Sequence, residues 1–163
     1  MSLNFTSIDQ PIRIKFTSFA ARGLQIKAIR IEVFHQEQKI DPALDFDGLD
    51  EEAIQVVAYI GDQAVGTMRV RQLAEATKIE RVAVLLPYRK QGVGTAMMLE
   101  ILTYLRARAI TNIILSAQRT SESFYRKLGF MPHGDAFREA GIEHIHMHYR
   151  PPIDEARSES ETS

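Results

Sequence analysis

The sequence contains no cysteine, and this absence removes three kinds of protein from consideration. A disulfide-stabilised secreted domain, a thiolate metal site and an enzyme with its own cysteine nucleophile all require this residue. The sequence also lacks a run of roughly 20 apolar residues, the length that crosses a bilayer. The first nine residues lack the basic and apolar regions of a signal peptide. We therefore expect a cytoplasmic protein with no membrane partner.

An excess of charge of either sign is absent as well. The 163 residues include 20 lysines and arginines against 21 aspartates and glutamates, a formal net charge of -1. Tight binding of nucleic acid needs a broad basic surface, so we expect no nucleic acid partner. With 45% hydrophobic residues, the chain can form one globular domain, which we expect over residues 1–150. The polar, serine-rich segment 151–163 is predicted to be a disordered tail.

Hydrophobic periodicity predicts a mixed α/β fold, because alternating apolar residues indicate strands and a spacing of three to four indicates helices. The predicted strands are 12–16, 55–60, 64–73, 78–86, 112–116 and 144–149, with a seventh near Met131. The predicted helices are 23–36, about 93–109, and one that begins at Ser121 and is closed by Gly129. We expect a loop around Gly134 and Gly141. The acidic segment 38–52 has no period and is predicted to be a surface loop beside a cleft.

The segment Arg89-Lys90-Gln91-Gly92-Val93-Gly94-Thr95 lies between a predicted buried strand and an amphipathic helix. The first amides of a helix have no intrahelical partner and lie at the positive end of its dipole, so they can bind a phosphate. The two glycines allow close approach, and the Arg-Lys pair adds positive charge. The spacing does not fit a Walker loop, and Met97 stands where a dinucleotide fingerprint needs a small residue. The pattern therefore predicts a different phosphate site.

Three of these residues, Arg89, Gly92 and Gly94, match the R/Q-x-x-G-x-G/A signature of the GNAT N-acetyltransferases, which this sequence resembles. Two further stretches look like motifs of that family: Arg81-Val82-Ala83-Val84 followed by Pro87-Tyr88-Arg89, and Phe124-Tyr125-Arg126-Lys127-Leu128-Gly129-Phe130. A narrower resemblance, to the ElaA-like subgroup, rests on Glu32-Val33-Phe34 with Glu37-Gln38, on Asp47-Gly48 with Asp50, and on Glu139-Ala140-Gly141-Ile142 with His144.

The resemblance implies a GNAT fold, with a mixed central sheet of six or seven strands that is splayed between strands 4 and 5 and flanked by about four helices. It implies transfer of the acetyl group of acetyl-CoA to a primary amine, on a small molecule or a peptide, by direct attack in a ternary complex without a metal. Related enzymes are often dimers, which suggests a homodimer. The alternative is a non-catalytic acyl-CoA-binding sensor or interaction module.

The resemblance also implies which residues hold the coenzyme. Backbone groups of one strand would pair with the pantetheine arm, and the glycine loop would hold the diphosphate. The implied cofactor-binding residues are Val82, Ala83, Val84, Arg89, Lys90, Gln91, Gly92, Val93, Gly94 and Thr95. For the two valines, simple core packing is also expected, since side chain and backbone do different work.

Two residues are candidates for moving protons. Alternation along the strand would place Glu80 on the same sheet face as Val82, where the family often has a base that acts through water. The alternative for Glu80 is a solvated or ion-paired carboxylate beside Lys78 and Arg81. Tyr125 matches the family position that commonly protonates the departing thiolate. Its alternative is a packed tyrosine whose hydroxyl is bound to the backbone.

Three histidines, His144, His146 and His148, recur at every second residue and would share one strand face. Such spacing can hold a metal, but no cysteine or obvious carboxylate ligand lies nearby, so we expect none. His144 lies nearest the expected cleft and is a candidate for contacting the substrate. The acidic loop, with Asp45 and Asp47, is expected to be solvated or to attract a cationic amine.

Overall fold

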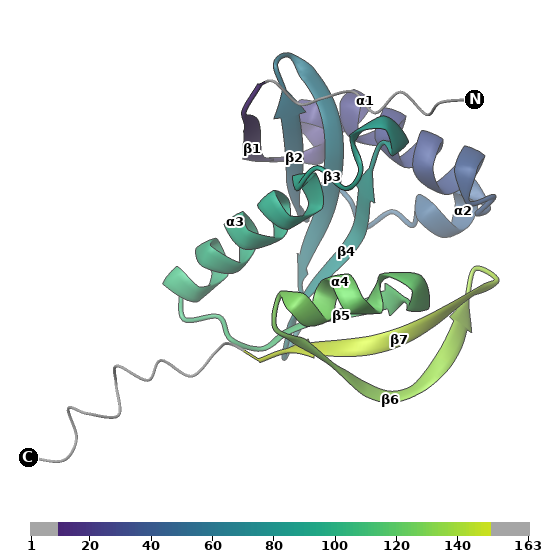
Figure 1. The fold of residues 1–163 in the computed structure, drawn as a ribbon, viewed down its shortest axis with the longest axis vertical. Helices are drawn as coiled ribbons and strands as arrows, with labels where there is room; N and C mark the ends of the chain where they lie inside the picture. The colour runs from purple at the N-terminus through teal and green to yellow at the C-terminus, as the bar shows by residue number, and fades with distance from the viewer. Residues whose placement is uncertain (1–9, 151–163) are drawn as a thin grey trace, which may run out of the picture.

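The computed structural model describes residues 10–150, which form one sheet with helices on both of its faces (Figure 1). In chain order the elements are β1 (Ile12–Thr17), α1 (Phe19–Arg30), the π-helical segment η1 (Ile31–Glu37), α2 (Pro42–Asp45), β2 (Ile54–Ile60), β3 (Gln63–Gln72), β4 (Thr77–Val84), the 3-10 turn η2 (Leu86–Tyr88), α3 (Val93–Ala107), β5 (Ile113–Gln118), the 3-10 turn η3 (Arg119–Ser121), α4 (Glu122–Lys127), β6 (Phe130–Glu139) and β7 (Ile142–Tyr149). The strand order is β1-β2-β3-β4-β5-β7-β6. This is the predicted mixed sheet, in its seven-stranded form.

The sheet opens between β4 and β5, its one parallel pair in the described residues. These strands pair only where Thr77 to Ile79 lie opposite Ile113 to Leu115, and beyond that point they share no register. A β-bulge lies beside the opening: the β3–β4 register shifts, and Arg81 has a φ of 55°. Bulges bend a strand and increase its twist. The predicted splay between strands 4 and 5 is therefore confirmed.

Helix α3 packs against β1 to β4 on one face, and α1 packs against β2 to β4 on the other. The four residues that predicted α3 are all buried: Met98, Ile101, Leu102 and Leu105. Burial of each such side chain contributes about 1.5–3 kcal/mol, which explains why this pattern identified the helix. We call the cluster around them the α3-side core; it also holds side chains of α4, β5 and β7.

The observed helix differs from the predicted helix 23–36 at both ends. It begins at Phe19, because the Ser18 side chain accepts a hydrogen bond from the Ala21 amide at 3.1 Å and caps the first turn. It ends in η1, where the Gln38 amide donates to the Val33 carbonyl five residues back. A π-helical turn widens the helix and is frequent at functional sites.

The loop expected around Gly134 and Gly141 is wrong for most of its length. Residues 130–139 form β6, which hairpins through Ala140 and Gly141 into β7, while Gly134 lies in a shift of register between the two strands. Most residues of β6 are partly or fully exposed, so the strand has no apolar alternation that would predict it. The predicted tail, 151–163, lies outside the described residues. No helix within residues 10–150 has the length and apolar character to cross a membrane.

Candidate active site

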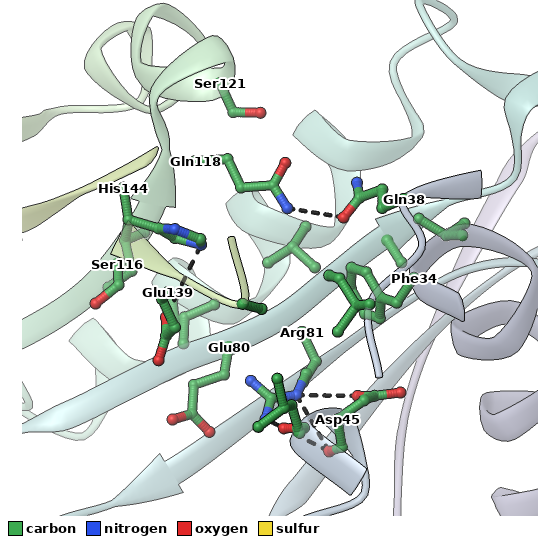
Figure 2. Close-up of a pocket in the computed structure, with 18 of the residues that line it drawn as sticks. Phe34, Gln38, Asp45, Glu80, Arg81, Ser116, Gln118, Ser121, Glu139 and His144 are labelled. Carbon is green, nitrogen blue, oxygen red and sulfur yellow. Dashed lines mark hydrogen bonds and ion pairs between the residues drawn. The ribbon is translucent and has the colours of Figure 1, made fainter. Parts of the chain in front are cut away.

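A cleft of about 680 Å³ lies where β4 and β5 separate. One wall comes from the segment between η1 and α2 together with β4, and the other comes from β5, α4 and the β6–β7 hairpin. Figure 2 shows Gln38 and Gln118 meeting across the cleft, where the Gln118 Nε2 donates a hydrogen bond to the Gln38 Oε1 at 2.8 Å. The cleft therefore reaches both faces of the sheet and has a polar bridge between its walls.

The start of α3 is open, as the glycine loop predicts. Gly92 is the N-cap residue with a φ of 87°, and no side chain caps the helix. The Ala96 amide is bonded to the Gly92 carbonyl at 2.9 Å, so the amides before it point out of the helix end. A Cβ on Gly94 would lie 3.2 Å from the Phe124 ring, so the glycine allows α4 to approach α3. This geometry can accept an anion on backbone donors.

Arg89 is held more firmly than the sequence suggested. Its Nε donates to the Val84 carbonyl at 2.8 Å, and its two terminal nitrogens each donate to a carboxylate oxygen of Glu37 at 2.6 Å. The guanidinium is therefore not a mobile charge, and cofactor binding by Arg89 stays a prediction. Glu37, 52 residues away in the chain, was missed because no local pattern links it to the loop. Lys90, at the turn of this loop, has a φ of 60°.

The residues that would flank the pantetheine arm, Val82, Ala83 and Val84, all line the cleft. The two valines pack against the α3-side core, and Ala83 packs against the cluster of α1 and η1 on the opposite face. Their side chains therefore have the packing role that the sequence left open. From Glu80 onward β4 has no β5 partner, which leaves its backbone edge facing the cleft.

Glu80 lies on the opposite sheet face from Val82, which corrects the predicted alternation. The bulge at Arg81 inserts one residue between them, so Ile79 and Val82 both meet the α3-side core while Glu80 faces Arg69. The prediction placed Glu80 on the wrong face because it counted alternate residues across the bulge. No glycine marks this bulge in the sequence.

The Glu80 carboxylate is held by three cations. It accepts hydrogen bonds from Arg69 at 2.9 and 2.6 Å and from Arg71 at 2.8 and 2.8 Å, and Lys78 lies 3.5 Å away. Burial alone would raise the pKa of Glu80, but the hydrogen bonds and charges of Arg71 and Arg69 outweigh it and lower the pKa to about 2. So acidic a carboxyl is a poor proton acceptor. The ion-paired alternative fits the geometry, with Arg69 and Arg71 as partners in place of Arg81.

Two aspartates of the acidic loop are buried, in contrast to the expected solvation, while Asp47, Glu51 and Glu52 are exposed. Asp45 and Asp50 are 3% and 5% exposed, and both bind the Arg30 guanidinium, at 2.8 and 2.6 Å. Asp47 pairs with Arg69 at 2.8 Å, and these hydrogen bonds hold the pKa of Asp47 far below its usual range despite partial burial. Arg30 and Arg69 are fully buried, so the loop is anchored beneath the cleft by compensated charges.

Tyr125 lines the cleft from α4 and is 8% exposed. Its ring lies between the edges of Phe124 and Phe130, at centroid distances of 5.0 and 6.1 Å. Burial raises the pKa of the Tyr125 phenol, so the group carries its proton at neutral pH.

The three histidines of β7 have separate surroundings. The ring of His144 lies in the cleft with Nδ1 2.7 Å from the Ile142 carbonyl oxygen. His146 is exposed and bonds Ser116 at 3.0 Å, and His148 stacks on His133. Only the first of the three therefore joins Tyr125 and Glu80 in the cleft.

A sheet opened at a parallel strand pair, with a cleft in the opening and an uncapped helix beside it, defines an acyltransferase fold. The sequence matches the family model of the acetyltransferase (GNAT) domain over residues 24–151. The chain therefore belongs to the GNAT acetyltransferases, and the predicted enzyme class, N-acetyltransferase, is confirmed.

Individual relatives agree with this assignment. The chain is 33% identical to the uncharacterized N-acetyltransferase YjcF of Bacillus subtilis over 120 residues, which are 73% of this chain and 86% of that protein. It is similar to the crystal structure of Escherichia coli ElaA, with a TM-score of 0.76 and 25% identity over 86% of this chain and 100% of ElaA. It shares its fold, at a TM-score of 0.63 and 15% identity, with the PaiA N-acetyltransferase of Thermoplasma acidophilum in complex with coenzyme A; that match covers 86% and 100% of the two chains.

Proposed function

We propose that this protein transfers the acetyl group of acetyl-CoA to a primary amine, carried by a small molecule or a peptide, by direct attack in a ternary complex. The observation that carries the proposal is the unpaired edge of β4 from Glu80 to Val84, which faces a cleft beside the open start of α3. A cytoplasmic location and a homodimer stay predictions.

The chemistry of the donors at this site fits coenzyme A. The amides at the start of α3 have the polarity that a diphosphate needs, and nothing lies within 4 Å of the position that a Cβ on Gly92 would take. The free strand edge offers amide and carbonyl groups to the two amide units of pantetheine, as in strand addition. The residues that would bind are Val82 to Val84 and Lys90 to Thr95, with Arg89 holding the loop through Glu37.

Tyr125 would return a proton to the sulfur as the carbon–sulfur bond breaks. A phenol with a raised pKa is a weak acid in water, but the same desolvation makes a thiolate in the cleft more basic. Burial strengthens proton binding at both groups, so it does not prevent transfer of the proton from the hydroxyl to the thiolate. The role of Glu80 as a base stays a prediction, and its ion pairs argue against it. We assign this residue the role of holding Arg69 and Arg71 beneath the cleft.

The test is release of free thiol from acetyl-CoA in the presence of amines, peptides and polyamines, with wild type and Tyr125→Phe. We expect the variant to lower kcat by at least about tenfold; general acid–base catalysis typically contributes about 100- to 10,000-fold. Tyr149→Phe is the matched control, because Tyr149 is also 8% exposed in the α3-side core but does not line the cleft. Equal rates for wild type and Tyr125→Phe would remove the acid role.

The same measurements separate an enzyme from a sensor. A protein that binds acetyl-CoA in a calorimeter but releases no thiol with any acceptor would be the non-catalytic module. A protein that binds neither acetyl-CoA nor coenzyme A would contradict both functions.

A further inference from the structure

We propose that His144 is a catalytic residue that takes the proton of the acceptor amine on its Nε2 atom, with Glu139 stabilising the protonated ring. The inference rests on the proposed function, since it requires the cleft to hold both the thioester and the amine. The proton acceptor would then lie on β7, whereas the sequence predicted it to be Glu80 on β4.

The strand directs His144 into the cleft. Its neighbours in the alternating pattern, Ile145 and Met147, are buried in the α3-side core, so the histidine faces the other side of the sheet. In the sheet register it lies opposite Gln118 on β5 and Phe137 on β6. It is 8% exposed and lines the cleft at the end of the β4–β5 opening (Figure 2).

Hydrogen bonding determines which ring nitrogen is free. The Nδ1 atom lies 2.7 Å from the Ile142 carbonyl oxygen, and a carbonyl can only accept, so Nδ1 carries a hydrogen. In the neutral ring, Nε2 therefore has an unshared electron pair. A ring stack on Phe137, with centroids 5.8 Å apart, supports this orientation. The histidine is thus held in the tautomer that a proton acceptor at Nε2 requires.

A carboxylate is placed to stabilise the charge that forms. The Nε2 atom lies 3.8 Å from an oxygen of Glu139 on β6, too far for a hydrogen bond but within ion-pair range once the ring is protonated. The other charged side chains that line the cleft are those of Glu37, Asp45, Asp47, Arg71, Lys78, Glu80, Arg81 and Arg89. The residue opposite on β5, Gln118, is neutral. The carboxylates of Glu37, Asp45, Asp47 and Glu80 are each paired with an arginine, so among the cleft-lining carboxylates of residues 10–150 it is Glu139 that is left to face the ring.

The proton donor and the proton acceptor belong to the same wall of the cleft but lie toward opposite faces of the sheet. Tyr125 packs with the α3-side core, whereas His144 points away from it, and both line the one cleft. In the reaction, the amine nitrogen bonds to the thioester carbonyl carbon and its proton passes to Nε2 of His144. The carbon–sulfur bond then breaks, and the sulfur takes the proton of Tyr125. Proton exchange with water returns both side chains to their starting states, so the step balances.

The test compares His144→Gln with wild type and with His146→Gln. The control lies two residues along the same strand but is exposed and bonds Ser116. We expect His144→Gln to lower kcat by about 100-fold, the lower end of the range for loss of a general base, with little change in the KM for acetyl-CoA. The wild-type kcat should rise with pH as the ring loses its proton, and this part of the rise should be absent in the variant. His146→Gln should keep both the rate and the rise.

Glu139→Gln is a second test of the inference. The Glu139 side chain is 63% exposed, so this substitution does not disturb a buried site. Since the carboxylate would stabilise the charge that forms on the ring during the transfer, its loss should lower kcat and leave the KM for acetyl-CoA unchanged. Melting curves and calorimetry with coenzyme A establish that each variant folds and binds.

The outcomes separate this inference from the proposed function. If wild type turns over and Tyr125→Phe is impaired while His144→Gln keeps both its rate and its pH dependence, the inference alone is overturned. If wild type acetylates no amine, the proposed function and the inference fall together. If His144→Gln raises only the KM for the amine and leaves the pH dependence intact, the residue binds substrate and the proton role is overturned.

Discussion

Replacing Glu80 with glutamine should destabilise the fold more than it impairs the chemistry. Each carboxylate oxygen now accepts hydrogen bonds from cations, and the glutamine amide would turn an N–H donor toward an arginine N–H. Removing one partner of a buried ion pair costs about 3–5 kcal/mol. Arg69 keeps Asp47 and Asp50, so we expect a loss of about 2–3 kcal/mol, which for a chain of this length lowers the Tm by about 5–10 °C.

The assay combines urea unfolding with a pH profile of the acetylation rate. Because the pKa of Glu80 is lowered to about 2, the carboxylate is ionised across the whole range in which the enzyme is assayed. Its replacement should therefore leave the shape of the pH profile unchanged. Glu80→Asp is the matched control: it keeps the charge, and we expect it to lose less stability than the glutamine variant.

A different result would refute this reasoning. If Glu80→Gln melted like wild type while kcat fell by about a hundredfold, the carboxylate would be a base, as general acid–base magnitudes require. The ion pairs would then be incidental to its role.

Two further predictions concern acid and the glycine loop. The folded pKa of Glu80, about 2, lies below its ordinary value of 4.5, so its stabilisation is present above about pH 4.5 and is lost as the pH falls toward 2. After allowance for solvent around the arginines it amounts to about 2 kcal/mol, so acid unfolding followed by circular dichroism should be shallower over that window in Glu80→Gln. Gly92→Ala should cost about 1 kcal/mol, because its φ of 87° strains any side chain although nothing lies within 4 Å. Gly94→Ala, which brings a Cβ to 3.2 Å from the Phe124 ring, should weaken coenzyme A binding in calorimetry more than Gly92→Ala does; equal affinities would contradict the role given to that approach.

The parts of the fold that the sequence predicted are those that local periodicity controls. Helix α3 buries one face, so burial and spacing coincide, and the β2–β3 hairpin is two continuous buried runs of β-forming residues joined by a Gly-Asp turn. Strand β6 is largely exposed and leaves no such pattern. The bulge at Arg81 is invisible because a non-glycine residue adopts the positive φ, and it reversed the face assigned to Glu80.

The candidate site divides in the same way. The glycine loop and Tyr125 lie within short motifs, so a resemblance could locate them. Arg30 and Arg69 are fully buried because carboxylates 11 to 22 residues away compensate them, and such pairing appears only when the chain is folded. The orientation of His144 likewise depends on a hydrogen bond to the Ile142 carbonyl, which strand alternation cannot predict.

The open start of α3 can be tested by following the backbone amide signals of the labelled protein during titration with coenzyme A. The amides of Gly92 to Thr95 should show the largest changes, and pantetheine, which lacks the diphosphate, should leave them unchanged. Binding of coenzyme A with those four signals unmoved would contradict the account.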